Sequence, residues 1–220
     1  MVKKQEKIVV LGTAHLGTTP GKCSPDGRLK EAAYSREIVG KVAERLRADG
    51  YDVYIDFMGL EPNPLMRGGT WKEEQNKELA WRVGFVNGVC ERYGKGNVVY
   101  VSMHVDAVGG DGKWHGARGF SVRVSPKGSA ESRRLAQCLY AAAKREGKAV
   151  TGNRATPAAG YWEQSLYVLN NTYCPAVLTE NLFQDNREDV DWLLSAEGRE
   201  AIVRLHVEGI KDYIAKCCEG

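Results

Sequence analysis

The sequence predicts an α/β fold of three layers, in which a central, mostly parallel, twisted sheet is flanked by helices. Short runs of β-branched and other apolar residues, such as Ile8–Leu11, alternate along the chain with longer segments of helical periodicity. These runs are apolar without a break, as is typical of strands buried on both faces of a parallel sheet. No linker, repeat or low-complexity segment interrupts the 220 residues. We therefore expect residues 1–220 to form one domain.

Composition and charge argue against several classes of function. The net charge is only +3, with acidic and basic residues interspersed, so no nucleic-acid partner is expected. No apolar stretch is long enough for stable membrane insertion, and no secretion signal follows the first residues. If Met1 is the natural start, the protein is expected to be made in the cytoplasm without a signal peptide. The six cysteines show no CxxC spacing, which favours a reducing compartment.

Apolar periodicity and turn residues define the elements of the N-terminal half. A strand is expected at Ile8–Leu11 and a helix at 29–49, closed by Gly50 as its C-cap. A second strand is expected at Tyr51–Ile55. The segment from Trp71 to Tyr93 has one apolar side and is expected to form the second helix.

The C-terminal half is expected to alternate in the same way. Its central strand begins at Asn97 and ends in Ser102–His104, before a glycine-rich loop. The segment Gly119–Val124 alternates, which predicts a strand with one solvated face near an edge of the sheet. The remaining expected elements are a helix from the N-cap Ser129 to Glu146, an irregular segment 151–164, a buried strand 175–179, a helical turn 189–194 and a terminal helix 196–216.

Polar side chains follow three of these strands directly. His15 lies just past the first strand, His104 ends the central one, and Glu180 ends the strand at 175–179. The carboxyl ends of parallel strands meet at one edge of a sheet, where α/β folds bind their ligands. Glu31 begins the helix after His15, in phase with the apolar stripe through Ile38. A carboxylate facing inward needs a counter-ion or a metal; the alternative is that Glu31 only complements the helix dipole.

Two imidazoles and one carboxylate form a common catalytic zinc set, with a position left open for water or substrate. A further carboxylate outside this set is suited to move the proton of an activated water. We therefore predict that His15, Glu31 and His104 bind Zn²⁺ and that Glu180 acts as general base and then acid in hydrolysing an amide. Spacing alone gives weak support, because no HExxH motif is present and each residue has a simple structural interpretation.

The segments around these residues resemble the zinc-dependent N-acetylmuramoyl-L-alanine amidases of the amidase 3 family, cell-wall hydrolases that include many phage endolysins. The resemblance runs nearly from end to end. At the first histidine the sequence departs from the family's Gly-His-Gly-Gly, because Ala14 and Leu16 flank His15. The resemblance is carried by Thr13–Gly17, Glu31 with Arg47–Val53, Ser102–Ala107, Leu166–Leu169 and Pro175–Phe183, continued by Asn186 and Asp189.

This resemblance implies hydrolysis of the amide bond between N-acetylmuramic acid and L-alanine in peptidoglycan, for cell-wall lysis or remodelling. The partner is then peptidoglycan, a glycan strand with its stem peptide, and the protein acts on the cell wall in the periplasm or outside the cell. A holin-type partner that permeabilises the membrane is expected to release it. Two alternatives remain: a carboxypeptidase-like zinc hydrolase of stem peptides, with Arg118 or Arg154 as carboxylate clamp, and a non-catalytic peptidoglycan-binding module.

Other side chains leave two interpretations open. Arg154, Tyr161 and Trp162 either contact glycan or stem peptide, or only pack inside the protein. His115, in a flexible loop, either reaches the oxyanion or stays solvated. His206 lies on the apolar stripe of the terminal helix, which favours a packing role.

Overall fold

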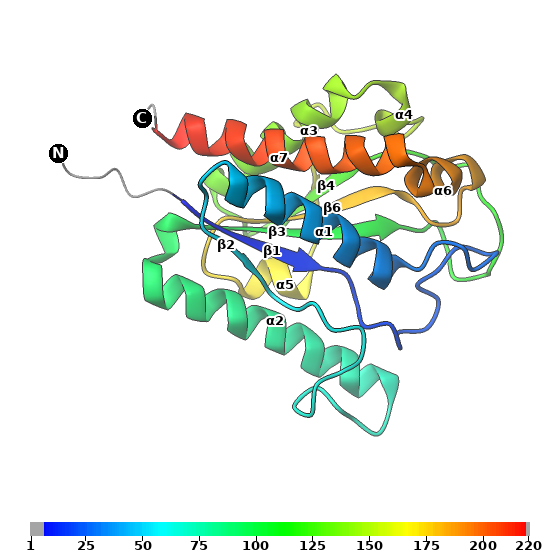
Figure 1. Cartoon of the computed structure of the whole chain (residues 1–220), viewed down its shortest axis with the longest axis horizontal. Helices are drawn as coiled ribbons and strands as arrows, with labels where there is room; N and C mark the ends of the chain where they lie inside the picture. Colours follow the sequence, from blue (N-terminus) through cyan, green and yellow to red (C-terminus); the bar gives the residue numbers. More distant parts are fainter. Residues whose placement is uncertain (1–6, 219–220) are drawn as a thin grey trace.

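The computed structural model describes residues 7–218, which form a six-stranded sheet between two layers of helices (Figure 1). The strand order is β2-β1-β3-β6-β4-β5. The first four strands in this order run parallel, and β4 runs antiparallel to β6. The predicted three-layer α/β fold is thus confirmed. The strands are β1 (Ile8–Thr13), β2 (Val53–Ile55), β3 (Val98–Asp106), β4 (Ser121–Val124), β5 (Trp162–Glu163) and β6 (Ala176–Phe183).

Helices cover both faces of the sheet. One face carries α1 (Glu31–Ala48), α3 (Ala130–Arg145) and α7 (Ala196–Cys218), and the other carries α2 (Trp71–Tyr93) and α5 (Tyr167–Asn171) (Figure 1). Within the described residues, no helix combines the length and the apolarity needed to cross a membrane. The short elements are α4 (Lys148–Thr151), α6 (Arg187–Leu194) and the 3₁₀ turn η1 (Lys95–Asn97).

Each face of the sheet has its own hydrophobic core. In β3, Val99 and Val101 belong to the larger core under α1, α3 and α7, whereas Val98 and Tyr100 belong to the smaller core under α2 and α5. This division follows from the alternation of side chains along a strand. The predicted stripe of α1 is buried against the larger core, including Ile38.

Three strand predictions need correction. β3 continues to Asp106 and β6 to Phe183, so His104 and Glu180 lie inside their strands and not at the last residue. The ladder between β3 and β6 continues past both residues, with an irregularity after His104. The solvated face predicted for 119–124 is wrong. Ser121 is buried, and the guanidinium of Arg123 lies 3.1 Å from the carboxylate of Asp106 and 5.6 Å from the centre of the Trp162 ring.

His206 is fully buried in α7, where the packing role was expected. Its Nδ1 lies 2.8 Å from the carbonyl oxygen of Ile202 and its Nε2 lies 2.9 Å from Oγ1 of Thr179. A carbonyl only accepts, so Nδ1 donates to Ile202 and Nε2 accepts from the Thr179 hydroxyl. Burial lowers the pKa of His206 from 6.5 to about 4.

We expect this histidine to make stability depend on pH. In the unfolded chain, His206 has a pKa of 6.5 and becomes protonated as the pH falls below that value. In the native state it stays neutral until the pH reaches about 4. The free energy of unfolding therefore falls as the pH is lowered through this window. The His206→Gln variant should lose this contribution, about 2 kcal/mol between pH 7 and pH 5. Urea unfolding at a series of pH values measures it, and parallel profiles for both proteins would contradict it.

Candidate active site

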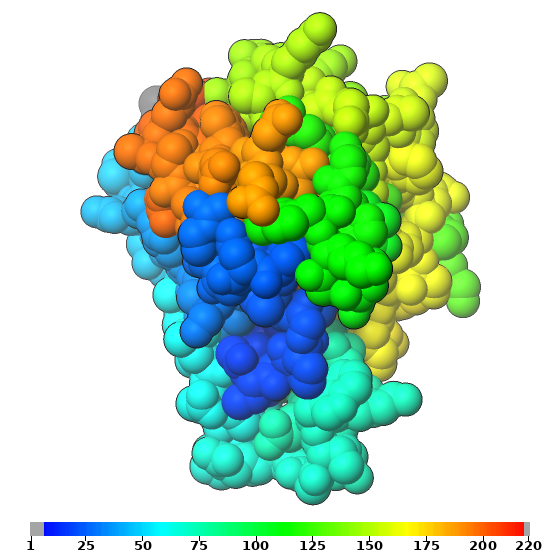
Figure 2. Space-filling model, turned by 90° about the vertical axis from the view of Figure 1, so that its right-hand side faces the viewer, coloured from blue at the N-terminus to red at the C-terminus, as the bar shows by residue number. Residues whose placement is uncertain are grey.

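The candidate site lies at the carboxyl edge of the sheet, on the face covered by α2 and α5. Tyr100 of β3 and Leu178 of β6 point to that face. Side chains alternate along a strand, so His104 and Glu180 point to it as well. His104 and Glu180 are partners in the parallel ladder, which places them on neighbouring strands about 4.8 Å apart. Figure 2 looks onto this edge, with the loop between β1 and α1 in blue near its centre.

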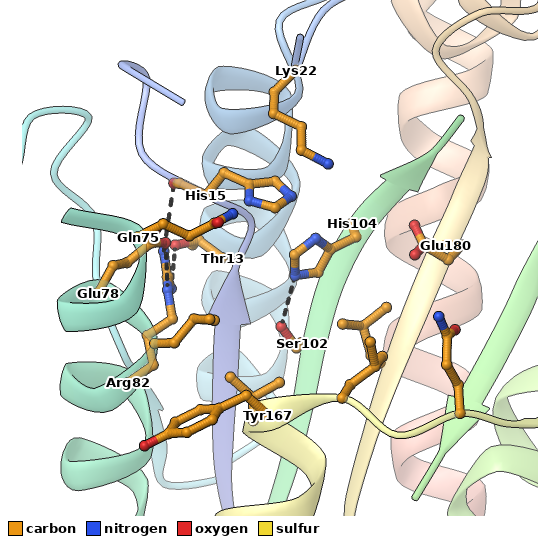
Figure 3. A pocket seen from close by; sticks show the side chains of 15 residues that line it. Thr13, His15, Lys22, Gln75, Glu78, Arg82, Ser102, His104, Tyr167 and Glu180 are labelled. Atoms are coloured by element: carbon orange, nitrogen blue, oxygen red, sulfur yellow. Dashed lines mark hydrogen bonds and ion pairs between the residues drawn. The ribbon is translucent and has the colours of Figure 1, made fainter. Parts of the chain in front are cut away.

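Glu31, the first residue of α1, meets both imidazoles. Its Oε1 lies 3.2 Å from Nδ1 of His104 and 3.6 Å from Nε2 of His15. The two rings lie edge to face, with their centroids 5.0 Å apart. One ligand atom from each of the three residues lies within 4.8 Å of the other two. Figure 3 shows the two imidazoles facing one another at the head of a pocket.

The chemistry of these donors fits a zinc ion. Burial lowers the pKa of His15 and of His104 to about 3, so each imidazole is neutral at pH 7 and keeps a lone pair for a metal. Glu31 is only 1% exposed, and its Oε2 accepts no hydrogen bond from residues 7–218. Tetrahedral zinc with bonds of about 2.0–2.1 Å separates its ligand atoms by about 3.3 Å. The 3.2 and 3.6 Å separations at Glu31 match that spacing.

Further contacts fix the orientation of these side chains. The backbone N–H of Val105 donates to Glu31 Oε1 at 3.2 Å, and Lys22 Nζ lies 3.9 Å from Oε2. Nε2 of His104 lies 3.2 Å from the hydroxyl oxygen of Ser102. Sequence analysis missed Lys22, which lies in a loop without regular structure and whose role depends on tertiary contact alone.

His15 lies in a strained turn after β1 that α1 holds in place. Its φ of 40° is in the left-handed region, which residues with a Cβ rarely adopt. The buried Arg36 donates to the carbonyl oxygens of Ala14 and His15, each at 2.8 Å. The Ser35 hydroxyl accepts from the N–H of Ala14 at 2.9 Å and donates to the carbonyl of Met103 at 2.6 Å. α1 therefore supplies Glu31 and also fixes the backbone that carries His15.

α2 supports the same turn from the opposite side. The guanidinium of Arg82 lies 2.6 Å from the carboxylate of Asp56 and 2.8 Å from that of Glu78, and it donates to the hydroxyl of Thr13 at 3.0 Å. Asp56 also accepts from the N–H of Thr13 at 3.1 Å. All three charged side chains are buried. The i,i+4 spacing of Glu78 and Arg82 looks like an ordinary surface pair in the sequence, so this network was not foreseen.

Glu180 lines the same pocket as His15 and His104, with a volume of about 260 Å³. Its Oε2 is buried and has no hydrogen-bond partner within the described part of the chain. Burial raises the pKa of Glu180 well above its usual value, and the negative charges of Asp106 and Glu31 raise it further. Arg123 and Lys22 lower this pKa in part. A carboxyl group in such surroundings can hold a proton near neutral pH.

Arg154 and Tyr161, two of the side chains with two open interpretations, contact other residues of the protein. Arg154 donates to Asp106 at 2.7 Å and to Ser121 at 2.8 Å, and its guanidinium lies 4.6 Å from the centre of the Phe183 ring. Tyr161 packs against the larger core. These contacts favour the packing interpretation over contact with glycan.

Two further candidates also have protein partners. The imidazole of His115 lies 3.0 Å from the carboxylate of Asp111. Arg118 binds the carboxylate of Glu188 and lies 2.8 Å from that of Asp189. Arg118 is therefore already neutralised by two acids, which weakens its interpretation as a clamp for a substrate carboxylate.

Known proteins resemble this chain in sequence and in fold. A family model described as N-acetylmuramoyl-L-alanine amidase matches residues 9–212. An endolysin of Bacillus phage SPP1 is 29% identical over 116 residues, which are 53% of this chain and 40% of the endolysin. This chain thus matches less than half the length of that relative.

Solved structures of amidases share the fold. The CwlD amidase of Clostridioides difficile, solved in complex with the GerS lipoprotein, has a TM-score of 0.78 at 20% identity, covering 96% of this chain and 100% of that chain. The catalytic domain of the CD27L endolysin, which targets Clostridia difficile, has a TM-score of 0.65 at 21% identity, covering 94% and 98%. Because the family model spans nearly the whole sequence, this chain belongs to the amidase 3 family of N-acetylmuramoyl-L-alanine amidases.

Proposed function

We propose that the protein is a zinc-dependent hydrolase of the amide bond between N-acetylmuramic acid and L-alanine in peptidoglycan. The observation that carries this proposal is the meeting of His15, Glu31 and His104 in one cluster, with Glu180 in the same pocket. Family membership supports the choice of the bond. Nε2 of His15, Nδ1 of His104 and the carboxylate of Glu31 would hold the ion.

A bound zinc ion supplies Lewis acidity, which polarises a carbonyl oxygen and brings the pKa of water to about 7. Glu180 removes a proton from the attacking water as the new C–O bond forms. Its raised pKa lets it hold that proton and then deliver it to the nitrogen of the departing amine as the C–N bond breaks. The products are a muramic acid carboxyl group and a stem peptide with a free amino terminus, so atoms and protons balance.

The two alternative functions have less support. A carboxypeptidase-like enzyme needs a cation free to bind a terminal carboxylate, and Arg118 and Arg154 are both paired with acids of the protein itself. A non-catalytic module has no use for a buried carboxylate such as Glu180 beside the metal ligands. Release by a holin-type partner and action in the periplasm or outside the cell stay predictions.

The proposal predicts that Glu180→Ala retains zinc and loses activity, because the residue moves protons and does not bind the ion. Loss of general acid–base catalysis should slow hydrolysis by about 10²–10⁴-fold. Turbidity loss of purified sacculi measures activity, and metal analysis measures zinc. Glu163→Ala is the control, since that acid is exposed at the end of β5. Loss of zinc from the Glu180 variant, or full activity in it, would contradict the assignment.

Product analysis separates the amidase from its rival. We expect new amino termini on L-alanine and free lactyl carboxyl groups on muramic acid, in equal amounts. Both should disappear when zinc is removed with a chelator and return when zinc is added. Release of a free amino acid from the stem peptide would favour the carboxypeptidase-like alternative.

The clamp on the His15 turn predicts a second effect. Arg36→Ala should weaken zinc binding by about 10–100-fold, as losses around metal ligands commonly do, because the carbonyls of Ala14 and His15 lose their donor. Competition with a chromophoric chelator measures the affinity, and thermal unfolding monitors the fold. Arg45→Ala on the same helix is the control, since that arginine forms an exposed pair with Glu200. Equal zinc affinities in the two variants would rule out the clamp.

A further inference from the structure

A small crevice lies between two loops at the carboxyl edge of the sheet, apart from the pocket of the candidate zinc site. Residues 21–25 of the β1–α1 loop line one side of it, and the glycine-rich loop at 109–113 lines the other. Figure 2 shows these two loops meeting, in blue and in green. Gln184 and Asp185, directly after β6, also line the crevice, and neither lines the zinc pocket. The crevice has a volume of about 160 Å³.

Each of the two residues after β6 presents a buried oxygen without a donor. Gln184 is 3% exposed, and its Nε2 donates to the carbonyl oxygen of Gly21 at 3.1 Å. Asp185 is 5% exposed, and its Oδ2 accepts from the N–H groups of Val108 at 2.7 Å and Gly109 at 3.3 Å. Oε1 of Gln184 and Oδ1 of Asp185 accept no hydrogen bond from residues 7–218. Buried acceptors without donors are costly, so two of them at one crevice indicate a ligand.

The carboxylate of Asp185 also lacks a positive counter-charge. The hydrogen bonds that it accepts come from backbone N–H groups, which carry no net charge. Lys113 lines the crevice, but this side chain is exposed and forms no ion pair with any residue that the structure describes. A buried carboxylate in such surroundings favours a positively charged ligand.

The available donor atoms favour a calcium ion over other metals. Ca²⁺ takes about six to eight oxygen ligands in a flexible arrangement, from carboxylates, amide and backbone carbonyls, and water. Zn²⁺ prefers imidazole and thiolate ligands, and no histidine lines this crevice. Mg²⁺ demands a rigid octahedron and keeps most of its water. The glycine-rich loop suits a calcium site, because a backbone without side chains can approach an ion closely.

We propose that this crevice is a calcium site, in which Oδ1 of Asp185 and Oε1 of Gln184 bind Ca²⁺, with backbone carbonyls and water as the remaining ligands. The ion joins the loop that leads from His15 to Glu31 to the loop that follows β3, and so stabilises both. It takes no part in the proposed hydrolysis. The inference is independent of the proposed function, since neither oxygen belongs to the proposed zinc cluster.

Luminescence of Tb³⁺, a hard ion that replaces Ca²⁺ at oxygen sites, tests the proposal on zinc-loaded protein. Excitation through tryptophan is suitable, because Trp114 directly follows the glycine-rich loop. We expect Ca²⁺ to displace Tb³⁺ with a Kd of about 0.1–1 mM, since the site has only one carboxylate. In Asp185→Asn the Kd should rise about tenfold, because NH₂ replaces Oδ1 while the amide oxygen still accepts from the two N–H groups. No saturable binding in the wild type, or an equal Kd in the variant, would overturn the proposal.

Gln184→Glu should change the affinity in the opposite direction. A second carboxylate at the site should lower the Kd for Ca²⁺ about tenfold. The same change removes the donor to the carbonyl of Gly21, so the variant should have a lower Tm without Ca²⁺ and regain it when Ca²⁺ is added. Binding no tighter than in the wild type would contradict the site, and this result stays decisive if Asp185→Asn fails to fold.

Two controls separate the crevice from other binding. Asp52→Asn changes an exposed acid before β2 and should leave the Kd for Ca²⁺ unchanged. Mg²⁺ should displace Tb³⁺ less effectively than Ca²⁺ does, and equal displacement would overturn the assignment to calcium. Metal analysis should show the same zinc content in all variants. If the wild type holds no zinc, the proposed function fails, and the comparison of Asp185→Asn with the wild type still decides the crevice.

Discussion

The buried carboxylate of Glu31 is the constraint on which the site depends. The apolar stripe of α1 forces this side chain inward, where water does not compensate its charge. The two imidazoles beside it are neutral, so they offer lone pairs and no positive charge. The N–H of Val105 and the distant ammonium of Lys22 compensate the negative charge of Glu31 only in part. A divalent cation held by the same three residues would resolve this imbalance, and this is the physical reason for proposing a metal here.

The fold positions the other groups in two ways. Side chains alternate along β3 and β6, and arginines from α1 and α2 bind the turn that follows β1. Along β3 and β6, apolar side chains such as Tyr100 and Leu178 point toward α2. Farther along the same two strands, His104 and Glu180 point to the same face of the sheet. Buried arginines from α1 and α2 hold the strained turn that carries His15. The site therefore combines one proposed metal ligand on each of a turn, a helix start and a strand, with the proposed general acid–base residue Glu180 on the next strand.

The sequence predicts the layers, most elements and the convergence of four residues, because apolar periodicity and helix phase are local properties. It does not predict where β3 and β6 end, since their ladder continues through pairing between residues far apart in the chain. The prediction that Arg123 of β4 is solvated is wrong, because its guanidinium pairs with the carboxylate of Asp106 inside the protein. The Arg82–Asp56 pair joins residues 26 positions apart and leaves no periodic trace. Ion pairs between residues far apart in the chain are therefore the features that could not be predicted from the sequence.

Anomalous diffraction at the zinc absorption edge, from crystals of the zinc-loaded protein, tests the central claim most directly. The account predicts one zinc peak bonded to Nε2 of His15, Nδ1 of His104 and a carboxylate oxygen of Glu31, with the Glu180 carboxylate near the ion and outside its ligand set. A peak at other residues, either imidazole turned away from the ion, or Glu180 as a direct ligand would contradict it.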